Sequence, residues 1–237
     1  MTNQDRALLH FHGGGYRAGA PELSRPLAGH LARRVGAEVT VPPYRLAPVH
    51  PFPAAVEDGL AAYAALLGRG FAPERTAVVG ESAGGGLALA VLVAAREAGL
   101  PMPGAAVGLS PWLDLTVEAP SYERCAATDP VLGRTDLLDS AVLYLAGADP
   151  RAPTASPLFA SAETLAALPP VLLQSSRDEV LADDAVRFGK RMAAVGGDCR
   201  VELWEDTTHC WQLFVDRLPV AVRAADCVAA FLRERLI

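Results

Sequence analysis

A serine that stands between an apolar run and a second, longer apolar run carries the clearest chemical signal in the sequence. The segment Gly80-Glu81-Ser82-Ala83-Gly84 follows Thr-Ala-Val-Val and precedes Gly-Gly-Leu-Ala-Leu-Ala-Val-Leu-Val-Ala-Ala. Gly-x-Ser-x-Gly between a strand and a helix places the serine on a sharp turn, where the glycines let strand and helix approach closely. This context favours Ser82 as a nucleophile over a serine that only shapes a turn.

A histidine late in the chain is the candidate base. A serine hydroxyl is a poor nucleophile at neutral pH, so it needs a general base, and that base needs a third group to orient it. The chain order for this strand-serine-helix arrangement is serine, then acid, then histidine. His209 is the only histidine after Ser82. We therefore predict that His209 is the base and that it reaches over the sheet from a loop.

Four carboxylates lie between these two residues in the segment Ser-Ser-Arg-Asp-Glu-Val-Leu-Ala-Asp-Asp: Asp178, Glu179, Asp183 and Asp184. Asp178 comes soonest after the apolar run Val-Leu-Leu-Gln, and catalytic residues of open α/β sheets gather at the carboxyl ends of strands. Asp183 and Asp184 would fall in the first turn of the next helix, where the helix dipole favours acids. We predict Asp178 as the acid.

A glycine loop near the N-terminus, His12-Gly13-Gly14-Gly15-Tyr16, could bind the negative charge that develops on a substrate oxygen. Glycines let backbone N–H groups approach such an oxyanion closely, and losing one donor typically costs about 3 kcal/mol of barrier. The N–H of Ala83, next to the nucleophile, would supply another donor. His10 and His12 could suggest a metal pair, but no third ligand lies nearby in the sequence, so we expect no metal.

Alternating strands and helices must position these groups. The apolar patterns predict strands at 7–11, 37–41, 76–79, 105–109, 171–174 and 200–204, and helices at 22–35, 53–67, 82–98, 182–195 and 218–236. Such alternation is typical of right-handed βαβ crossovers and of a parallel sheet covered on both faces. We predict a single α/β domain over 1–237.

One long segment breaks the alternation. Residues 115–160 lie between the fourth and fifth predicted strands and contain helical stretches at 121–126 and 136–145 among Pro- and Asp-rich turns. Insertions of this length are usually functional when they are ordered. We interpret 115–160 as a cap or lid over the site.

The composition excludes several classes of protein. The chain has 237 residues, of which 51% are hydrophobic and 20% charged, which is typical of a folded globular domain. The net charge is -6 and the basic residues are scattered, so no nucleic-acid partner is expected. Only one of the 21 basic residues, Lys190, is a lysine, which we interpret as compositional drift toward arginine.

No segment predicts a membrane or export role. The longest apolar run, 87–95, is far shorter than the roughly 20 residues that span a bilayer. The first residues lack the apolar core of a secretion signal, so a cytoplasmic location is expected. The cysteines are widely spaced without a Cys-x-x-Cys pair, which favours free thiols over zinc or disulfides: Cys125, Cys199, Cys210 and Cys227.

Together these motifs resemble the hormone-sensitive-lipase-like esterases (bacterial family IV) of the α/β-hydrolase fold. The similar segments run in the family's order along nearly the whole chain: HGGGY at 12–16, YRLAP and HPFPAA within 44–55, GESAGGG at 80–86, LSPWLDLT at 109–116, ASPLF at 155–159, DEVLADDA at 178–185 and His209 with Trp211. The combination of HGGG with GxSAGG distinguishes this family from most other α/β-hydrolases.

The resemblance implies a serine esterase that acts on small-molecule carboxylic esters, mostly with short to medium acyl chains, and that needs no cofactor. It implies Ser82, Asp178 and His209 as the triad, with Gly14, Gly15 and Ala83 as the oxyanion donors. Three aromatic residues beside the motifs are expected to contact the substrate: Tyr16, Trp112 and Trp211.

The chain also departs from the family pattern. Pro43 and Val49 stand where acids are usual, so we do not expect the family's ion pair of those acids with Arg45. The family usually has a long leading segment that contributes to the cap and to the first two strands, whereas the first strand predicted here begins within the first ten residues. We therefore expect six parallel strands with 37–41 at an exposed edge, where Pro42 and Pro43 remove hydrogen-bond donors.

Two further expectations come from this departure. Half of the usual cap would be missing, so the pocket should be unusually open and accept bulky esters. A homodimer through an edge strand is also possible in this arrangement. Two other functions stay open: an amide or formamide hydrolase that uses the same triad, and a non-catalytic small-molecule binding protein on this fold.

Overall fold

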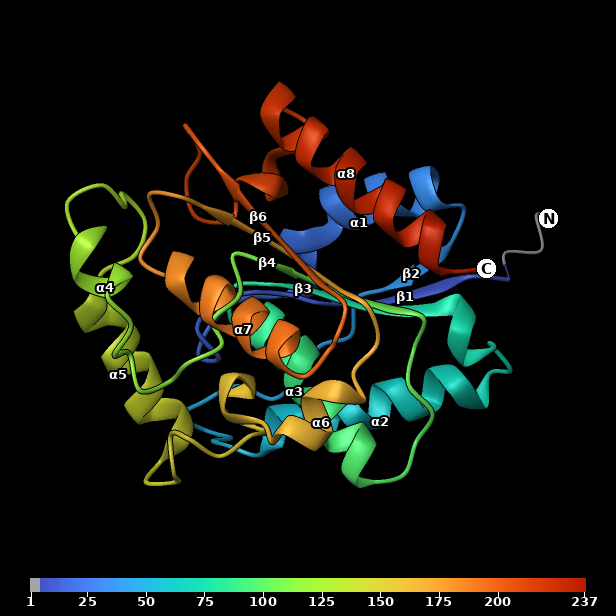
Figure 1. The fold of residues 1–237 in the computed structure, drawn as a ribbon, viewed down its shortest axis with the longest axis horizontal. Helices are drawn as coiled ribbons and strands as arrows, with labels where there is room; N and C mark the ends of the chain where they lie inside the picture. The colour runs from blue at the N-terminus through green and yellow to red at the C-terminus, as the bar shows by residue number, and fades with distance from the viewer. Residues whose placement is uncertain (1–4) are drawn as a thin grey trace.

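The computed structural model describes residues 5–237 and contains one parallel sheet of six strands (Figure 1). The strands are β1 (Ala7–Phe11), β2 (Glu38–Thr40), β3 (Thr76–Glu81), β4 (Ala105–Leu109), β5 (Val171–Ser176) and β6 (Cys199–Trp204). Their order is β2-β1-β3-β4-β5-β6, and every pairing is parallel. The predicted α/β fold and all six strands are confirmed.

The register brings the carboxyl ends of the central strands to one edge. Phe11 pairs with Gly80, Glu81 with Leu109, and Leu109 with Gln174. Because all the strands are parallel, the segments that leave β1, β3, β4, β5 and β6 emerge on the same side of the molecule. The glycine loop, Ser82 and the loop that carries His209 all belong to these segments.

Helices cover both faces of the sheet (Figure 1). On one face α1 (Pro21–Val35) and α8 (Pro219–Arg235) pack together over β1, β3 and β4. On the other lie α2 (Ala54–Gly68), α3 (Ala83–Glu97) and α7 (Ala182–Ala194). The helix predictions agree with these bounds to within two residues. A short helix, α6 (Ala162–Ala166), and three 3-10 helices, 73–75, 157–159 and 211–214, were not predicted.

The helix that follows Ser82 is buried along nearly its whole length. Twelve of the fifteen residues of α3 are buried, because it lies between the sheet and α2. A Cβ atom on Gly80 would lie 2.1 Å from the Gly84 carbonyl oxygen, and one on Gly84 would lie 2.1 Å from the Phe11 carbonyl oxygen. Only glycine fits at these two places, so the turn at Ser82 depends on both.

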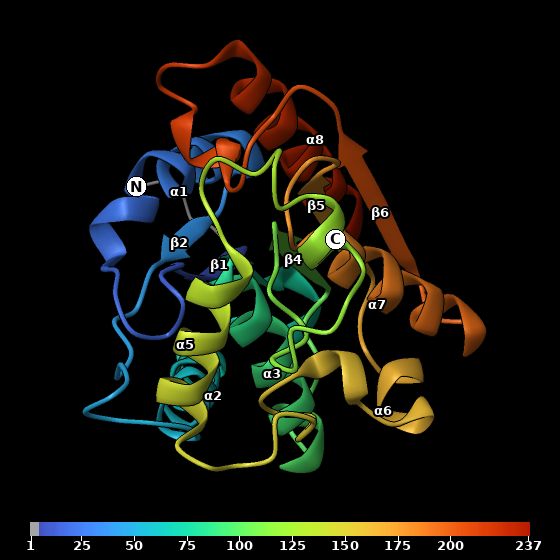
Figure 2. The ribbon, with the colours of Figure 1, turned by 90° about the vertical axis from the view of Figure 1, so that its left-hand side faces the viewer.

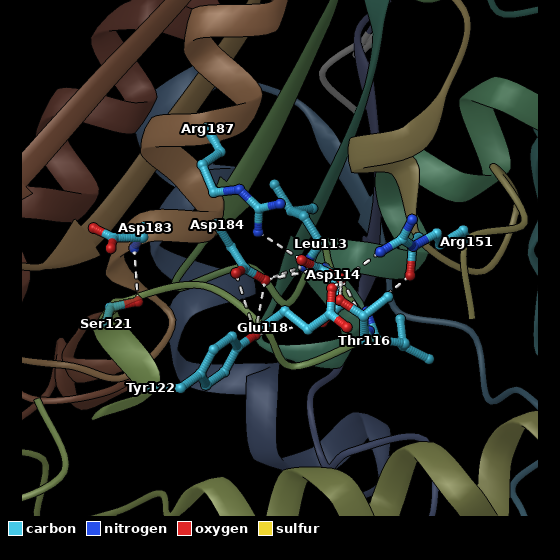
Figure 3. A network of polar contacts seen from close by, with 12 residues as sticks. Leu113, Asp114, Thr116, Glu118, Ser121, Tyr122, Arg151, Asp183, Asp184 and Arg187 are labelled. Carbon is cyan, nitrogen blue, oxygen red and sulfur yellow. Dashed lines mark hydrogen bonds and ion pairs between the residues drawn. The ribbon is translucent and has the colours of Figure 1, made fainter. Parts of the chain in front are cut away.

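The segment between β4 and β5 contains α4 (Ser121–Arg124) and α5 (Arg134–Leu145), which face the viewer in Figure 2. A buried polar network attaches its first part to α7 (Figure 3). Asp184 Oδ2 accepts hydrogen bonds from the backbone N–H groups of Leu113 (2.9 Å) and Asp114 (3.0 Å). Arg187 of α7 donates to the Asp114 carboxylate at 2.5 Å, and the Tyr122 hydroxyl lies 3.2 Å from both Asp184 oxygens.

The structure also bears on the expected sheet edge, on the partners of Arg45, on Lys190 and on membrane-spanning helices. β2 forms one edge of the sheet, as predicted, and Pro42 and Pro43 follow it. Arg45 pairs instead with Glu57 and Asp58 of α2, so it has acidic partners without the family's usual acids. Lys190 is exposed on α7. Among residues 5–237, no helix has the length and apolar character needed to cross a membrane.

Candidate active site

Ser82 lies on a strained turn between β3 and α3. Its backbone angles are φ 56° and ψ -125°, a conformation that non-glycine residues rarely adopt. The backbone is held by hydrogen bonds on both sides: its N–H donates to the Leu109 carbonyl at 2.9 Å, and its carbonyl accepts from Gly85 and Trp112 at 3.0 Å each. The turn therefore presents the side chain of Ser82 at the carboxyl edge of the sheet.

A chain of hydrogen bonds joins this serine to a buried carboxylate. His209 Nε2 lies 2.9 Å from Ser82 Oγ, and His209 Nδ1 lies 2.7 Å from Glu179 Oε2. The other oxygen of Glu179 accepts the backbone N–H of Ser176 at 2.9 Å. Glu179 is buried and its carboxylate is thereby oriented toward the ring. This is the geometry that a general base needs to accept a proton from a serine hydroxyl.

Two serines at strand ends hold the loop that carries His209. Ser176 Oγ, at the end of β5, donates to the Thr207 carbonyl at 2.7 Å. Ser110 Oγ, just after β4, accepts the backbone N–H of Cys210 at 3.1 Å. Both serines are fully buried. The loop is therefore fixed to the sheet both before His209, at Thr207, and after it, at Cys210, and this positions the imidazole.

The glycine loop lies directly beside Ser82. A Cβ atom on Gly13 would lie 3.1 Å from Ser82 Cβ, so the two backbones are close. The N–H of Gly13 is already used, because it donates to Glu81 Oε1 at 2.9 Å. The Tyr44 hydroxyl donates to the His12 carbonyl at 2.7 Å, and the Tyr44 ring stacks on the His12 ring with centroids 4.3 Å apart. The loop is thus held from the sheet and from the segment after β2.

A cavity of about 590 Å³ opens over Ser82 and His209. Gly14 and Gly15 form part of its wall. Much of the remaining wall is apolar and comes from α1, from the segment between β4 and β5, and from the segment after β6: Leu23, Val131, Leu132, Leu137, Leu213 and Phe214. Three of these side chains, Leu23, Val131 and Phe214, are exposed. The cavity can hold a small apolar molecule with a polar group at Ser82.

A family model described as alpha/beta hydrolase fold matches residues 8–213. The chain belongs to the α/β-hydrolase fold family. An acetyl-hydrolase of Streptomyces hygroscopicus is 44% identical over 228 residues, which cover 96% of this chain and 75% of that protein. An esterase of Acinetobacter venetianus is 32% identical and is covered to 76%. The crystal structure of an esterase from the bacterial hormone-sensitive lipase family matches with a TM-score of 0.94 and 43% identity, covering 99% of this chain and 78% of that one.

The acid contact in this α/β-hydrolase differs from the prediction. Asp178 is exposed, and it is Glu179, the next residue, that reaches His209. The backbone of Asp178 takes part in the turn, with its N–H donating to Ser176 Oγ at 3.2 Å and its carbonyl accepting from Thr128. Both residues satisfy the rule that the acid follows β5, but only Glu179 points inward at the carboxyl edge of the sheet. The prediction of Asp178 as the partner of His209 was wrong.

The three aromatic residues predicted to contact substrate lie elsewhere. Tyr16, Trp112 and Trp211 are almost completely buried, and none of them lines the cavity. Tyr16 stacks on Tyr144 of α5 with ring centroids 3.9 Å apart. The Trp112 indole donates to the Asp114 carbonyl, and Trp211 packs beside Trp204. These side chains attach neighbouring segments to the core, so the substrate-binding prediction for them is corrected.

A thiol that the sequence analysis did not single out contacts the imidazole. Cys210 Sγ lies 3.3 Å from His209 Nε2, and Cys210 adopts a left-handed backbone conformation with φ 54°. Burial disfavours the charged ring, but the hydrogen-bonded Glu179 carboxylate outweighs it, and the pKa of His209 lies well above its usual value. Burial raises the pKa of the Cys210 thiol. The imidazole therefore holds its proton to higher pH than a free histidine does.

The histidine pair near the N-terminus has other partners. His10 Nε2 lies 2.6 Å from Glu81 Oε2, and His12 Nδ1 lies 2.8 Å from the Gly13 carbonyl oxygen. Within residues 5–237, no group of three His, Cys, Asp or Glu side chains is arranged to hold a metal ion. All four cysteines are free thiols, two of them buried (Cys125 and Cys210) and two half-buried (Cys199 and Cys227).

Proposed function

We propose that this α/β-hydrolase is a serine carboxylesterase in which Ser82 is the nucleophile, His209 the base and Glu179 the residue that orients His209. The observation that carries the proposal is the hydrogen-bonded chain from Ser82 Oγ through His209 to the buried Glu179. The esterase and acetyl-hydrolase relatives support the choice of an ester as substrate.

The reaction proceeds through an acyl-enzyme. Ser82 Oγ attacks the ester carbonyl carbon while its proton passes to His209 Nε2, and the carbonyl oxygen becomes an oxyanion. The C–O bond to the alcohol then breaks, and His209 donates the proton to the leaving oxygen. A water molecule repeats the sequence on the acyl-enzyme: it gives a proton to His209 and forms a C–O bond, and Ser82 leaves with that proton.

The oxyanion donors in this proposal are the N–H groups of Gly14, Gly15 and Ala83. Support comes from their positions, because Gly14 and Gly15 line the cavity and Ala83 begins α3 directly after the nucleophile. Gly13 is not proposed, since its N–H already donates to Glu81. Preformed N–H groups of this kind lower the barrier because they need no reorganisation when the charge develops.

We propose that the substrates are short- to medium-chain esters and that bulky acyl or alcohol groups are accepted. The cavity volume of about 590 Å³ and the exposed apolar side chains at its rim support this. Residues 115–160 act as the cap in this proposal, since Val131, Leu132 and Leu137 supply one wall. A profile of relative turnover over acetyl, butyryl, octanoyl and bulky aryl esters tests it. Activity on acetyl esters alone would contradict it.

The proposed activity is tested with p-nitrophenyl butyrate on the native protein and on Ser82→Ala. We expect the native protein to hydrolyse the ester and the variant to lose at least about 10³-fold in kcat while keeping its melting temperature. An organophosphonate should label Ser82 of the native protein and not the variant. Turnover of an anilide with no turnover of esters would favour an amide hydrolase. Binding without turnover or labelling would favour a non-catalytic binding protein.

We also propose a cytoplasmic location and a homodimer. Four free thiols fit a reducing compartment, where disulfides are rare. Of the two sheet edges, β6 is the better pairing surface, because β2 has only three residues and is followed by two prolines. Recovery of the native protein outside the cell would contradict the first proposal. A monomer at all concentrations in sedimentation velocity would contradict the second.

A further inference from the structure

The residue before the nucleophile has an unusual side-chain environment. Glu81 ends β3 and is 1% exposed, although it carries a carboxylate. Burying an unpaired carboxylate is very costly, so such groups persist only where donors surround them. Glu81 takes no part in the proton path from Ser82 to Glu179, and the Gly-x-Ser-x-Gly motif asks for no acid at its second position.

Three donors from three different elements converge on this carboxylate. Oε1 accepts the Gly13 backbone N–H at 2.9 Å and the Ser24 hydroxyl of α1 at 2.6 Å. Oε2 lies 2.6 Å from His10 Nε2 of β1. Among residues 5–237, His10 Nδ1 is buried and has no hydrogen-bond partner, so the hydrogen bond to Glu81 is the one that orients the ring. The carboxylate thus joins β1, β3, α1 and the glycine loop at one point.

We propose that Glu81 is a positioning residue that holds the glycine loop in the geometry required to bind the oxyanion. The N–H of Gly13 immediately precedes Gly14 and Gly15 in the chain, so a bond to Gly13 sets where the next two N–H groups point. The loop contains Gly14 at φ 123° and Gly15 at φ 61°, and glycine backbone has wide conformational freedom unless it is held. Because Glu81 is covalently next to Ser82, it ties the donors and the nucleophile to the same turn.

The chemistry of the site explains why a carboxylate suits this task. A carboxylate has two acceptor oxygens and no donor, so it can receive Gly13, Ser24 and His10 together. A glutamine has one acceptor oxygen and a donor amide, so it can keep the Gly13 bond only with one of its other partners rearranged. Hydrogen bonds to a charged acceptor are also stronger than those between neutral groups.

The inference rests on the proposed ester hydrolysis and is tested with Glu81→Gln and Glu81→Ala. Oxyanion contacts act on the transition state more than on the bound ester. We therefore expect Glu81→Ala to lower kcat by about 10²-fold with KM changed by less than about threefold, and Glu81→Gln to show a smaller loss. Ser24→Ala keeps the Gly13 bond and should lose least of the three.

A second readout separates positioning from a merely structural role. Phenylboronic acid forms a tetrahedral adduct with a catalytic serine and so probes the oxyanion donors. Its inhibition constant should rise in proportion to the loss of kcat/KM across the three variants, whereas the inhibition constant of the product butyrate should not change. Asp184→Asn is the matched control: Asp184 is another buried carboxylate that accepts two backbone N–H groups, and its variant should keep native kcat and boronate affinity.

The outcomes are distinct. The inference would be overturned if folded Glu81 variants kept the native kcat or showed a higher one. It would also be overturned if their kcat fell while their affinity for phenylboronic acid stayed native. If Glu81→Ala does not fold, Glu81→Gln and Ser24→Ala provide the test: their inhibition constants for phenylboronic acid should rise in proportion to their loss of kcat/KM. A native protein that hydrolyses no ester would instead overturn the proposed function itself.

Discussion

At the scale of single residues, the site is defined by a choice between two neighbouring acids. Asp178 is exposed and Glu179 is buried against His209, although the two follow β5 by almost the same distance. Chain order and strand position indicate an acid in this turn but not which side chain points inward. That direction is set by the bond from the Ser176 N–H to Glu179 Oε1, which depends on the folded turn.

The first prediction concerns this pair of acids. Glu179→Gln should lower kcat by about 10³- to 10⁴-fold, because an amide can no longer fix the tautomer and stabilise the charged ring of His209. Asp178→Asn is the control of matched chemistry and should stay within about twofold of the native kcat. Steady-state hydrolysis of p-nitrophenyl butyrate measures both. The larger loss in Asp178→Asn would show that the acid has been assigned to the wrong residue.

The second prediction is a pH dependence. The base must be neutral to accept the Ser82 proton, and the Glu179 carboxylate beside it raises the pKa of His209. As pH falls through this raised pKa, His209 becomes protonated and activity should be lost. The acidic limb of the kcat/KM profile should therefore lie above about pH 6.5, the ordinary pKa of histidine. Cys210→Ala should leave the limb in place, because a thiol whose pKa is raised is neutral at this pH and places no charge beside the ring. A native limb at or below the ordinary value would contradict the expectation.

At the scale of elements, the sequence predicts the positions of the strands and long helices well, and the contacts between side chains less well. Strands and long helices follow from apolar periodicity, because each must bury one face or both faces in the core. The wall of the cavity was not predicted, since Leu23 and Phe214 lie far apart in the chain and meet only through the sheet order. Tyr16 and Trp211 were misassigned because an aromatic side chain beside a motif can equally well face the core.

The network between α7 and the segment after β4 gives the third prediction. Asp184 lies beside Asp114 in this network (Figure 3). Burial and the neighbouring Asp114 raise the pKa of Asp184 well above its usual value. The folded state then binds more protons than the unfolded state between the usual and the raised value. Over that range the free energy of unfolding should therefore decrease as pH rises. Asp184→Asn keeps the acceptor for the Leu113 and Asp114 N–H groups and removes the titration.

Urea unfolding of both proteins from acidic to alkaline pH measures this. The variant should lose less stability than the native protein as pH rises, and at neutral pH it should be about as stable or more stable. Parallel pH dependences for the two proteins would contradict the assignment of the effect to Asp184.

At the scale of the whole molecule, the sheet has two different edges. β2 is short and is closed by Pro42 and Pro43, whereas β6 has six residues without proline. Unpaired strands are surfaces for association unless they are blocked. The sequence predicts the blocked edge from its prolines, but the open edge follows only from the strand order, which places β6 last.

The fourth prediction follows from the open edge. If two copies associate through β6, the dimer should dissociate on dilution, because a contact made mainly by one strand is small. Leu203→Pro within β6 should weaken it, because the backbone N–H of Leu203 points away from β5. Val39→Pro, the equivalent outward-facing position of β2, should leave it unchanged. Sedimentation velocity with circular dichroism to check folding measures both. A dimer that is weakened only by the β2 variant would place the contact at the other edge.

The arginine-rich surface has a practical consequence. Lys190 is the only lysine side chain in the sequence, it is exposed on α7, and it does not line the cavity over Ser82. Apart from the chain's own amino terminus, amine-selective reagents therefore have one primary target. Coupling through this amine would attach a dye or a solid support at a defined point, and most of the immobilised molecules would share one orientation with the substrate entrance free.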